Sequence, residues 1–152
     1  DRERKRELLQ QIYVPYRESV TAAIEKQLAH SGKAIHLSVH TFTPSLDGKL
    51  RHCDLGFLYD PARPAEAAFV RDLIPQFRSA NLRVRRNYPY RGTSDGLVTT
   101  LRKQLHHPAY LGIELEVNQR HFIDSADQGN GVVALVRRGL ETMLTSFSWP
   151  EH

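Results

Sequence analysis

The chain has 152 residues, 40% of them hydrophobic, and a net charge of +4 at pH 7, which suits one domain with its own hydrophobic core. No apolar run approaches the roughly 18 residues needed to cross a bilayer, and no charged-then-apolar leader is present. Cys53 is the only cysteine, which excludes an intrachain disulfide and a zinc site made of cysteines. We therefore expect a cytoplasmic protein that does not contact membranes.

The first forty residues predict helix followed by strand. Residues 1–12 form a charged, helix-prone run, and Pro15 suits the first turn of a second helix, which ends near Gly32. Residues 34–40 alternate between apolar and polar side chains, which is the period of a half-buried strand. That strand ends at His40, just before small polar residues and a proline.

The middle of the chain continues this alternation. After a polar loop over residues 43–52, a second strand is predicted over residues 54–59. Pro61 and Pro64 open a helix with an apolar face, and Pro75 kinks or shortens it. The expected buried residues of this helix are Phe69, Val70, Leu73 and Phe77.

Two strands and two helices are expected in the rest of the chain. A short strand over residues 82–86 precedes a helix over about 96–106, and residues 110–117 alternate apolar residues with glycine and glutamate. A last helix over about 130–147 has an apolar stripe, made of Val133, Val136, Leu140, Leu144 and Phe147. The order of elements predicts a three-layer α/β/α domain around a mostly parallel or mixed central sheet.

His40 is the first candidate for chemistry. Ligands of open α/β sheets bind at the carboxyl ends of strands, so His40 stands where a metal ligand or a catalytic base would act. The alternative is a histidine that ends the strand and only hydrogen-bonds to the backbone.

Two carboxylates are the second candidates. Glu114 and Glu116 are two residues apart on a predicted strand, so their side chains share one face. A carboxylate near the carboxyl edge of a sheet can act as a general base, especially where burial raises its pKa. Glu116 is nearer the strand end and is the better catalytic candidate, while Glu114 is expected to be structural. The alternative is a solvent-facing strand with two exposed glutamates.

Basic and aromatic residues suggest a ligand site. The loop with Asn87, Tyr90 and Arg91 combines amide, aromatic and guanidinium groups, and arginine suits bidentate binding of a carboxylate. Arg51 and His52 either bind substrate or are simply solvated. The positive charge also permits nucleic acid, but the basic stretch is short and has no recognised binding motif, so no nucleic-acid partner is expected.

Five segments, in order, resemble motifs of the N-formylglutamate amidohydrolase family, which is related in fold to the zinc carboxypeptidases. In the family these motifs read Arg-Pro-Tyr/Phe-His, Asp-Leu-His-Ser-Phe, Asp-Ile-Gly, Asn-x-Pro-Tyr-x-Gly and Leu-Glu-(Ile/Val)-(Arg/Asn). The matching segments here are Val14 to Arg17, Leu37 to Phe42, Cys53 to Gly56, Asn87 to Gly92 and Leu115 to Gln119. Ser38 replaces the usual acid before the histidine, and Arg17 replaces a frequent histidine.

The resemblance implies a zinc-dependent amidohydrolase that cleaves the amide bond of an N-acyl amino acid such as N-formylglutamate. It implies that His40 is a zinc ligand, that Glu116 is the catalytic glutamate, and that Asn87, Tyr90 and Arg91 bind substrate. The family's first zinc-binding segment has no counterpart here. Residues 1–152 are thus expected to be the C-terminal two-thirds of such a domain, with the remaining zinc ligands upstream of Asp1. The alternative is a non-catalytic member that binds a small acidic ligand or a protein partner.

Overall fold

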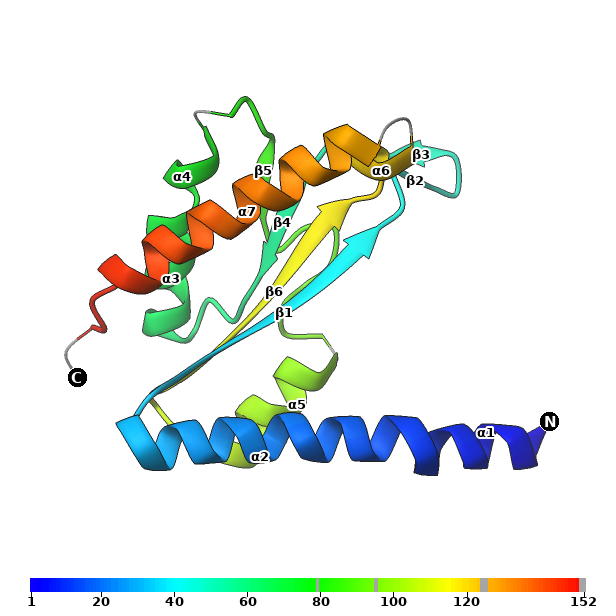
Figure 1. Ribbon diagram of the computed structural model, residues 1–152, viewed down its shortest axis with the longest axis vertical. Coiled ribbons are helices and arrows are strands. Elements are labelled where there is room, and N and C mark those ends of the chain that lie inside the picture. Colours follow the sequence, from blue (N-terminus) through cyan, green and yellow to red (C-terminus); the bar gives the residue numbers. More distant parts are fainter. Residues whose placement is uncertain (79, 95, 124–125, 151–152) are drawn as a thin grey trace.

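A four-stranded mixed sheet lies at the centre of the protein (Figure 1). Its strand order is β1-β6-β4-β5; β1 runs parallel to β6, β5 runs parallel to β4, and β4 is antiparallel to β6. The strands are β1 (Ala34–Phe42), β4 (Leu55–Leu58), β5 (Val84–Arg86) and β6 (Tyr110–Asn118). The structure is a computed structural model that describes residues 1–78, 80–94, 96–123 and 126–150.

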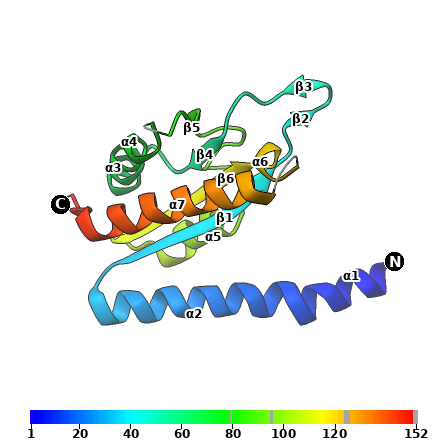
Figure 2. The same ribbon diagram turned by 45° about the horizontal axis from the view of Figure 1, so that its top comes forward.

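Helices cover both faces of this sheet, which confirms the predicted three-layer fold (Figure 2). One face carries the main core, packed by α3 (Pro64–Leu73), α4 (Pro75–Arg78) and α7 (Ala126–Ser146). The other face carries a smaller core under α2 (Val14–Ser31) and α5 (Gly96–Leu105). Among the described residues, no helix is long and apolar enough to cross a membrane.

The alternation in β6 decides which side chains enter the main core. The odd-numbered residues of this strand are apolar and at most 5% exposed, and they pack against α3, α4 and α7. Since neighbouring residues of a strand point to opposite faces, the even-numbered positions, with Glu114 and Glu116, face the side of α2 and α5. The predicted strand over residues 110–117 is confirmed, with one further residue at its end.

The predicted second helix forms as α2, with Pro15 in its first turn, but it is not separate from the helix before it. Helix α1 (Arg2–Leu8) continues without a break through a π-helical turn, η1 (Leu9–Tyr13), into α2. The Val14 N–H donates to the Leu9 carbonyl, five residues back, which is the bond of a π turn. A proline inside a helix lacks one donor and crowds the preceding turn, and the wider turn accommodates Pro15 there.

Other boundaries differ from the predictions in small ways. The loop over 43–52 contains a hairpin, and a short helix follows β6; these elements are β2 (Ser45–Leu46), β3 (Lys49–Leu50) and α6 (Arg120–Ile123). Asp47 and Gly48 both have positive φ, as in a tight hairpin turn. In α7, Val133 and Leu144 are 54% and 57% exposed, contrary to prediction, because the preceding residues, Val132 and Met143, face the core in their place.

A buried ion pair fastens the helices to the sheet. Glu66 of α3 is fully buried, and its carboxylate accepts two hydrogen bonds of 2.9 Å from Arg102 of α5. The same carboxylate accepts backbone N–H groups of Asp60 and Gly112 at 2.8 and 3.2 Å. Arg102 also donates to the carbonyl of Gly92, which lies in the loop that leaves β5. This one pair therefore links α3, α5, β6 and that loop.

Candidate active site

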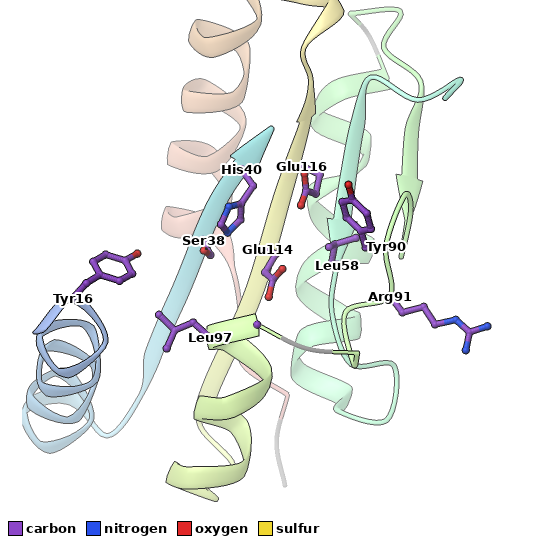
Figure 3. A pocket seen from close by; sticks show the side chains of 10 residues that line it. Tyr16, Ser38, His40, Leu58, Tyr90, Arg91, Leu97, Glu114 and Glu116 are labelled. Carbon is purple, nitrogen blue, oxygen red and sulfur yellow. Dashed lines mark hydrogen bonds between the residues drawn. The ribbon is translucent and has the colours of Figure 1, made fainter. Parts of the chain in front are cut away.

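A pocket of about 370 Å³ opens on the face of the sheet opposite the main core (Figure 3). It lies where β1 and β6 approach their carboxyl ends, between the first half of α2, the start of α5 and the loop after β5. Its lining residues are Tyr16, Ser38, His40, Leu58, Tyr90, Arg91, Gly96, Leu97, Glu114 and Glu116. The pocket therefore lies at the kind of strand edge at which α/β folds bind ligands.

The register of the sheet brings the polar residues together. Ser38 pairs with Glu114, and His40 pairs with Glu116, so these four side chains share the face of the pocket. On the other side of β6, Gly56 pairs with Glu116. A Cβ at position 56 would collide with the carbonyl of Tyr88, so only glycine lets the loop after β5 come this close to Glu116.

Glu116 has the properties of a proton acceptor. Its side chain is 5% exposed, and among the described residues its Oε2 atom is buried without a hydrogen-bond partner. Burial raises the pKa of Glu116; His40 opposes this rise, Glu114 adds to it, and Arg51 opposes it. A carboxyl group with a raised pKa in a pocket is suited to take up a proton and release it again during a reaction. The alternative of two solvent-exposed glutamates is wrong for Glu116.

His40 lies in the same pocket, beside Glu116 in the register. Its imidazole is exposed, and its Nε2 atom is 2.9 Å from the hydroxyl of Ser38. The prediction that the strand ends at His40 is wrong, because β1 continues to Phe42, and this contact of the imidazole is with a side chain and not with the backbone. The structure brings together the two residues that sequence reasoning ranked first.

The loop residues have different positions. Asn87 accepts backbone N–H groups of Tyr59 and Gly92 on its Oδ1 atom, at 3.0 and 3.2 Å, so that oxygen holds the loop in shape. Tyr90 and Arg91 line the pocket, whereas Asn87 is not among the lining residues. Figure 3 shows Tyr90 rising toward Glu116 and the Arg91 side chain extending away from both glutamates. Substrate binding by these three residues stays a prediction.

The family model for N-formylglutamate amidohydrolase matches residues 1–123, a span that includes all five motif-like segments. The chain belongs to the N-formylglutamate amidohydrolase family. The predicted family resemblance is therefore confirmed. A search of curated proteins finds no match.

Two solved structures share the fold of this family member. A gene product of Agrobacterium tumefaciens is 23% identical, with a TM-score of 0.66 over 94% of this chain and 56% of its own. N-formylglutamate amidohydrolase from Ralstonia eutropha is 16% identical, with a TM-score of 0.71 over 92% of this chain and 54% of its own. The chain thus spans about half the length of either of these two proteins.

The family implies a metal, and the pocket supplies part of a donor set for it. An imidazole and a carboxylate, His40 and Glu116, lie beside each other, and both groups are common partners of catalytic zinc. Such a zinc normally takes three protein ligands and a water. Among the residues that the structure describes, no three histidine, cysteine, aspartate or glutamate side chains are arranged to hold one ion. The described residues therefore do not supply a complete set of zinc ligands, and the role of His40 as one ligand stays a prediction.

Sequence reasoning missed several pocket residues of this amidohydrolase-family chain. Tyr16, Leu58 and Leu97 come from α2, β4 and α5, and no local pattern marks them as neighbours of His40. Tyr16 lies within the segment that resembles the family's Arg-Pro-Tyr/Phe-His motif, which is the one signal that pointed to it. In the sequence, Ser38 stands out only as a departure from the family pattern.

A second cluster of charges secures the end of the sheet next to the pocket. Asp54 is 1% exposed; its Oδ2 accepts the Arg83 N–H at 2.7 Å, and its Oδ1 contacts Arg120 and lies 2.7 Å from Nε2 of His121. Burial alone would raise the pKa of Asp54, but the hydrogen bonds and charges of these partners outweigh it, and the net pKa is lowered. The carboxylate therefore stabilises the fold in its ionised form.

We expect the stability contributed by Asp54 to depend on pH. A lowered pKa means that the contribution is complete above the ordinary value of 3.8 and is lost as pH falls through the folded-state pKa. Asp54→Asn should lower the free energy of unfolding by about 1–3 kcal/mol at pH 6, and the difference from the native protein should shrink below pH 4. Urea unfolding over this pH range measures it. Asp72→Asn, in an exposed pair with Arg71, is the control, and a pH-independent difference for Asp54→Asn would contradict the prediction.

Proposed function

We propose that this chain forms the general-base and substrate-binding side of an amidohydrolase active site that cleaves the amide bond of N-formylglutamate or a related N-acyl amino acid. The observation that carries the proposal is Glu116, a buried carboxylate with a raised pKa whose Oε2 atom has no partner among the described residues, in a pocket beside His40. Membership of the N-formylglutamate amidohydrolase family supports the choice of reaction.

The proposed reaction uses one water. Glu116 accepts a proton from that water as its oxygen bonds to the formyl carbon, and the same carboxyl group then gives the proton to the leaving amine as the C–N bond breaks. The products are formate and glutamate. Burial favours the first step, because a carboxylate in an apolar setting is a stronger base than one in water. Zinc, when bound, would polarise the carbonyl and lower the pKa of the water.

In this proposal His40 is one zinc ligand, and the other ligands come from residues outside 1–152. We also propose that the substrate is a small molecule, that nucleic acid is not a partner, and that the protein is cytoplasmic. A non-catalytic member that binds a small acid is the second candidate. It is favoured by the bond between His40 Nε2 and Ser38, since that nitrogen would otherwise be open to a metal.

The test is formate release from N-formylglutamate by the protein expressed from its complete reading frame. We expect turnover that is lost on chelation and restored by added zinc. A folded, zinc-supplied protein that binds the compound without releasing formate would instead support the second candidate.

If His40 is a zinc ligand, His40→Ala should weaken zinc binding by at least roughly 10- to 100-fold. That factor is the usual cost of losing a residue that only hydrogen-bonds to a metal ligand, and loss of a ligand itself should cost no less. Equilibrium dialysis against zinc measures this without reference to activity. His30→Ala is the matched control, because His30 is exposed in the last turn of α2, away from the pocket. Equal zinc affinity of the native and His40→Ala proteins would remove His40 from the metal site.

A further inference from the structure

Arg51 contacts Tyr90 of the pocket wall, although Arg51 is not itself among the lining residues, and its backbone is held by hydrogen bonds. Its N–H donates to the Pro44 carbonyl at 2.8 Å, across the β2-β3 hairpin. Its own carbonyl accepts a bond of 3.3 Å from Nδ2 of Asn118, which also donates to the carbonyl of Cys53 at 2.7 Å. Asn118 is fully buried and follows Glu116 by two residues on β6, so the strand that carries Glu116 also positions Arg51.

The side chain of Arg51 is held just as firmly. Its guanidinium lies 5.3 Å from the ring centre of Tyr90 and 5.9 Å from that of Phe42, the range of a cation–π contact. It also donates a hydrogen bond of 3.2 Å to the hydroxyl of Tyr90, a residue of the pocket wall. A guanidinium has five N–H donors, and this bond takes one of them.

The charge of Arg51 is not used for a structural ion pair among the described residues, where no carboxylate lies within ion-pair distance of it. It is close enough to Glu116 to lower the pKa of that residue. Arg91, the arginine that lines the pocket, is exposed and its side chain extends away from the glutamates (Figure 3). A rigid, half-buried cation at the rim of an acid-lined pocket is suited to hold an anionic group of a ligand.

We infer that Arg51 binds a carboxylate of the substrate and so selects acidic N-acyl amino acids over neutral ones. The inference depends on the proposed function for the identity of the reaction, whereas the binding of an anion by Arg51 does not depend on it. Arg51 places the substrate's carboxylate at the rim, while the amide reaches into the pocket toward Glu116. Tyr90 and Phe42 fix the guanidinium in one orientation, and Asn118 is a positioning residue that acts through the backbone of Arg51.

The first experiment measures binding of glutarate, and of its neutral analogue glutaramide, by calorimetry with the protein expressed from its complete reading frame. Arg51→Gln should weaken glutarate binding roughly 10- to 100-fold, as expected for loss of a hydrogen bond between charged groups, and should leave glutaramide unaffected. Arg51→Lys, which keeps the charge, should lose less. Arg85→Gln is the matched control, because Arg85 also lies over a tyrosine ring, that of Tyr88 at 5.0 Å, but Tyr88 does not line the pocket as Tyr90 does.

The outcomes separate this inference from the proposed function. Glutarate binding that is absent in the native protein, unchanged in Arg51→Gln, or lost only in Arg91→Gln would overturn the role of Arg51. Binding that depends on Arg51 without formate release would keep the anion site and reject the hydrolysis. Formate release with an unchanged KM in Arg51→Gln would keep the hydrolysis and reject the anion site. A KM for N-formylglutamate that rises 10- to 100-fold with kcat little changed supports both.

Discussion

Replacing Glu116 with glutamine is expected to slow formate release by roughly 10²–10⁴-fold, the usual contribution of a general acid–base group. Glutamine keeps the size and the hydrogen-bonding reach of the side chain but cannot accept the proton of the attacking water. Because the Oε2 atom of Glu116 has no partner among the described residues, the exchange breaks no described bond of that atom, and the fold should be retained. Steady-state rates and thermal unfolding of the native and variant proteins measure the two effects.

The pH profile provides a second readout for Glu116. A general base must be ionised, so the native rate should rise with pH through a pKa above the ordinary glutamate value of 4.5. Glu116→Gln should lose this limb of the profile. Glu114→Gln is the comparison on the same face of β6; we expect it to act mainly on stability and less on rate. Full activity of Glu116→Gln would remove this residue from the mechanism.

Replacing Glu66 with glutamine is expected to lower the free energy of unfolding by about 3–5 kcal/mol, the cost of leaving a buried charge without its partner. Arg102 is only 8% exposed and would keep its charge, while the variant amide would meet its N–H donors with one oxygen instead of two. The loop with Gly92 should loosen as well, because Arg102 donates to its carbonyl. Urea unfolding monitored by far-UV circular dichroism measures the loss.

Two comparisons sharpen the Glu66 prediction. Glu141→Gln breaks an exposed pair with Arg137, 3.2 Å apart on α7, and should cost at most about 0.5 kcal/mol. The double variant Glu66→Met, Arg102→Met should be less destabilised than the sum of its single changes, because neither charge is left buried alone. A loss below about 1 kcal/mol in Glu66→Gln would show that this pair does not hold the layers together.

Much of the fold could be predicted because its signals are local. The alternation over residues 34–40 and 110–117 depends only on which neighbouring side chains are apolar, and both strands form. His40 and Glu116 could be ranked as candidates on the same basis, since each is a polar residue near the carboxyl end of a strand. Pro75 ends α3 and begins α4, as the backbone chemistry of proline predicts.

The composition of the site depended on contacts between residues far apart in the chain. The register that sets His40 beside Glu116, the antiparallel direction of β4 and the approach of Tyr16 all follow from packing of the whole domain. Arg51 could equally have been solvated; its place at the pocket comes from Asn118, 67 residues later. No local pattern contains such pairings, because their energy arises only when the two segments meet. The sequence by itself determined the main strands and helices and the chemical groups that they carry, and the tertiary structure alone decided which of those groups share one pocket.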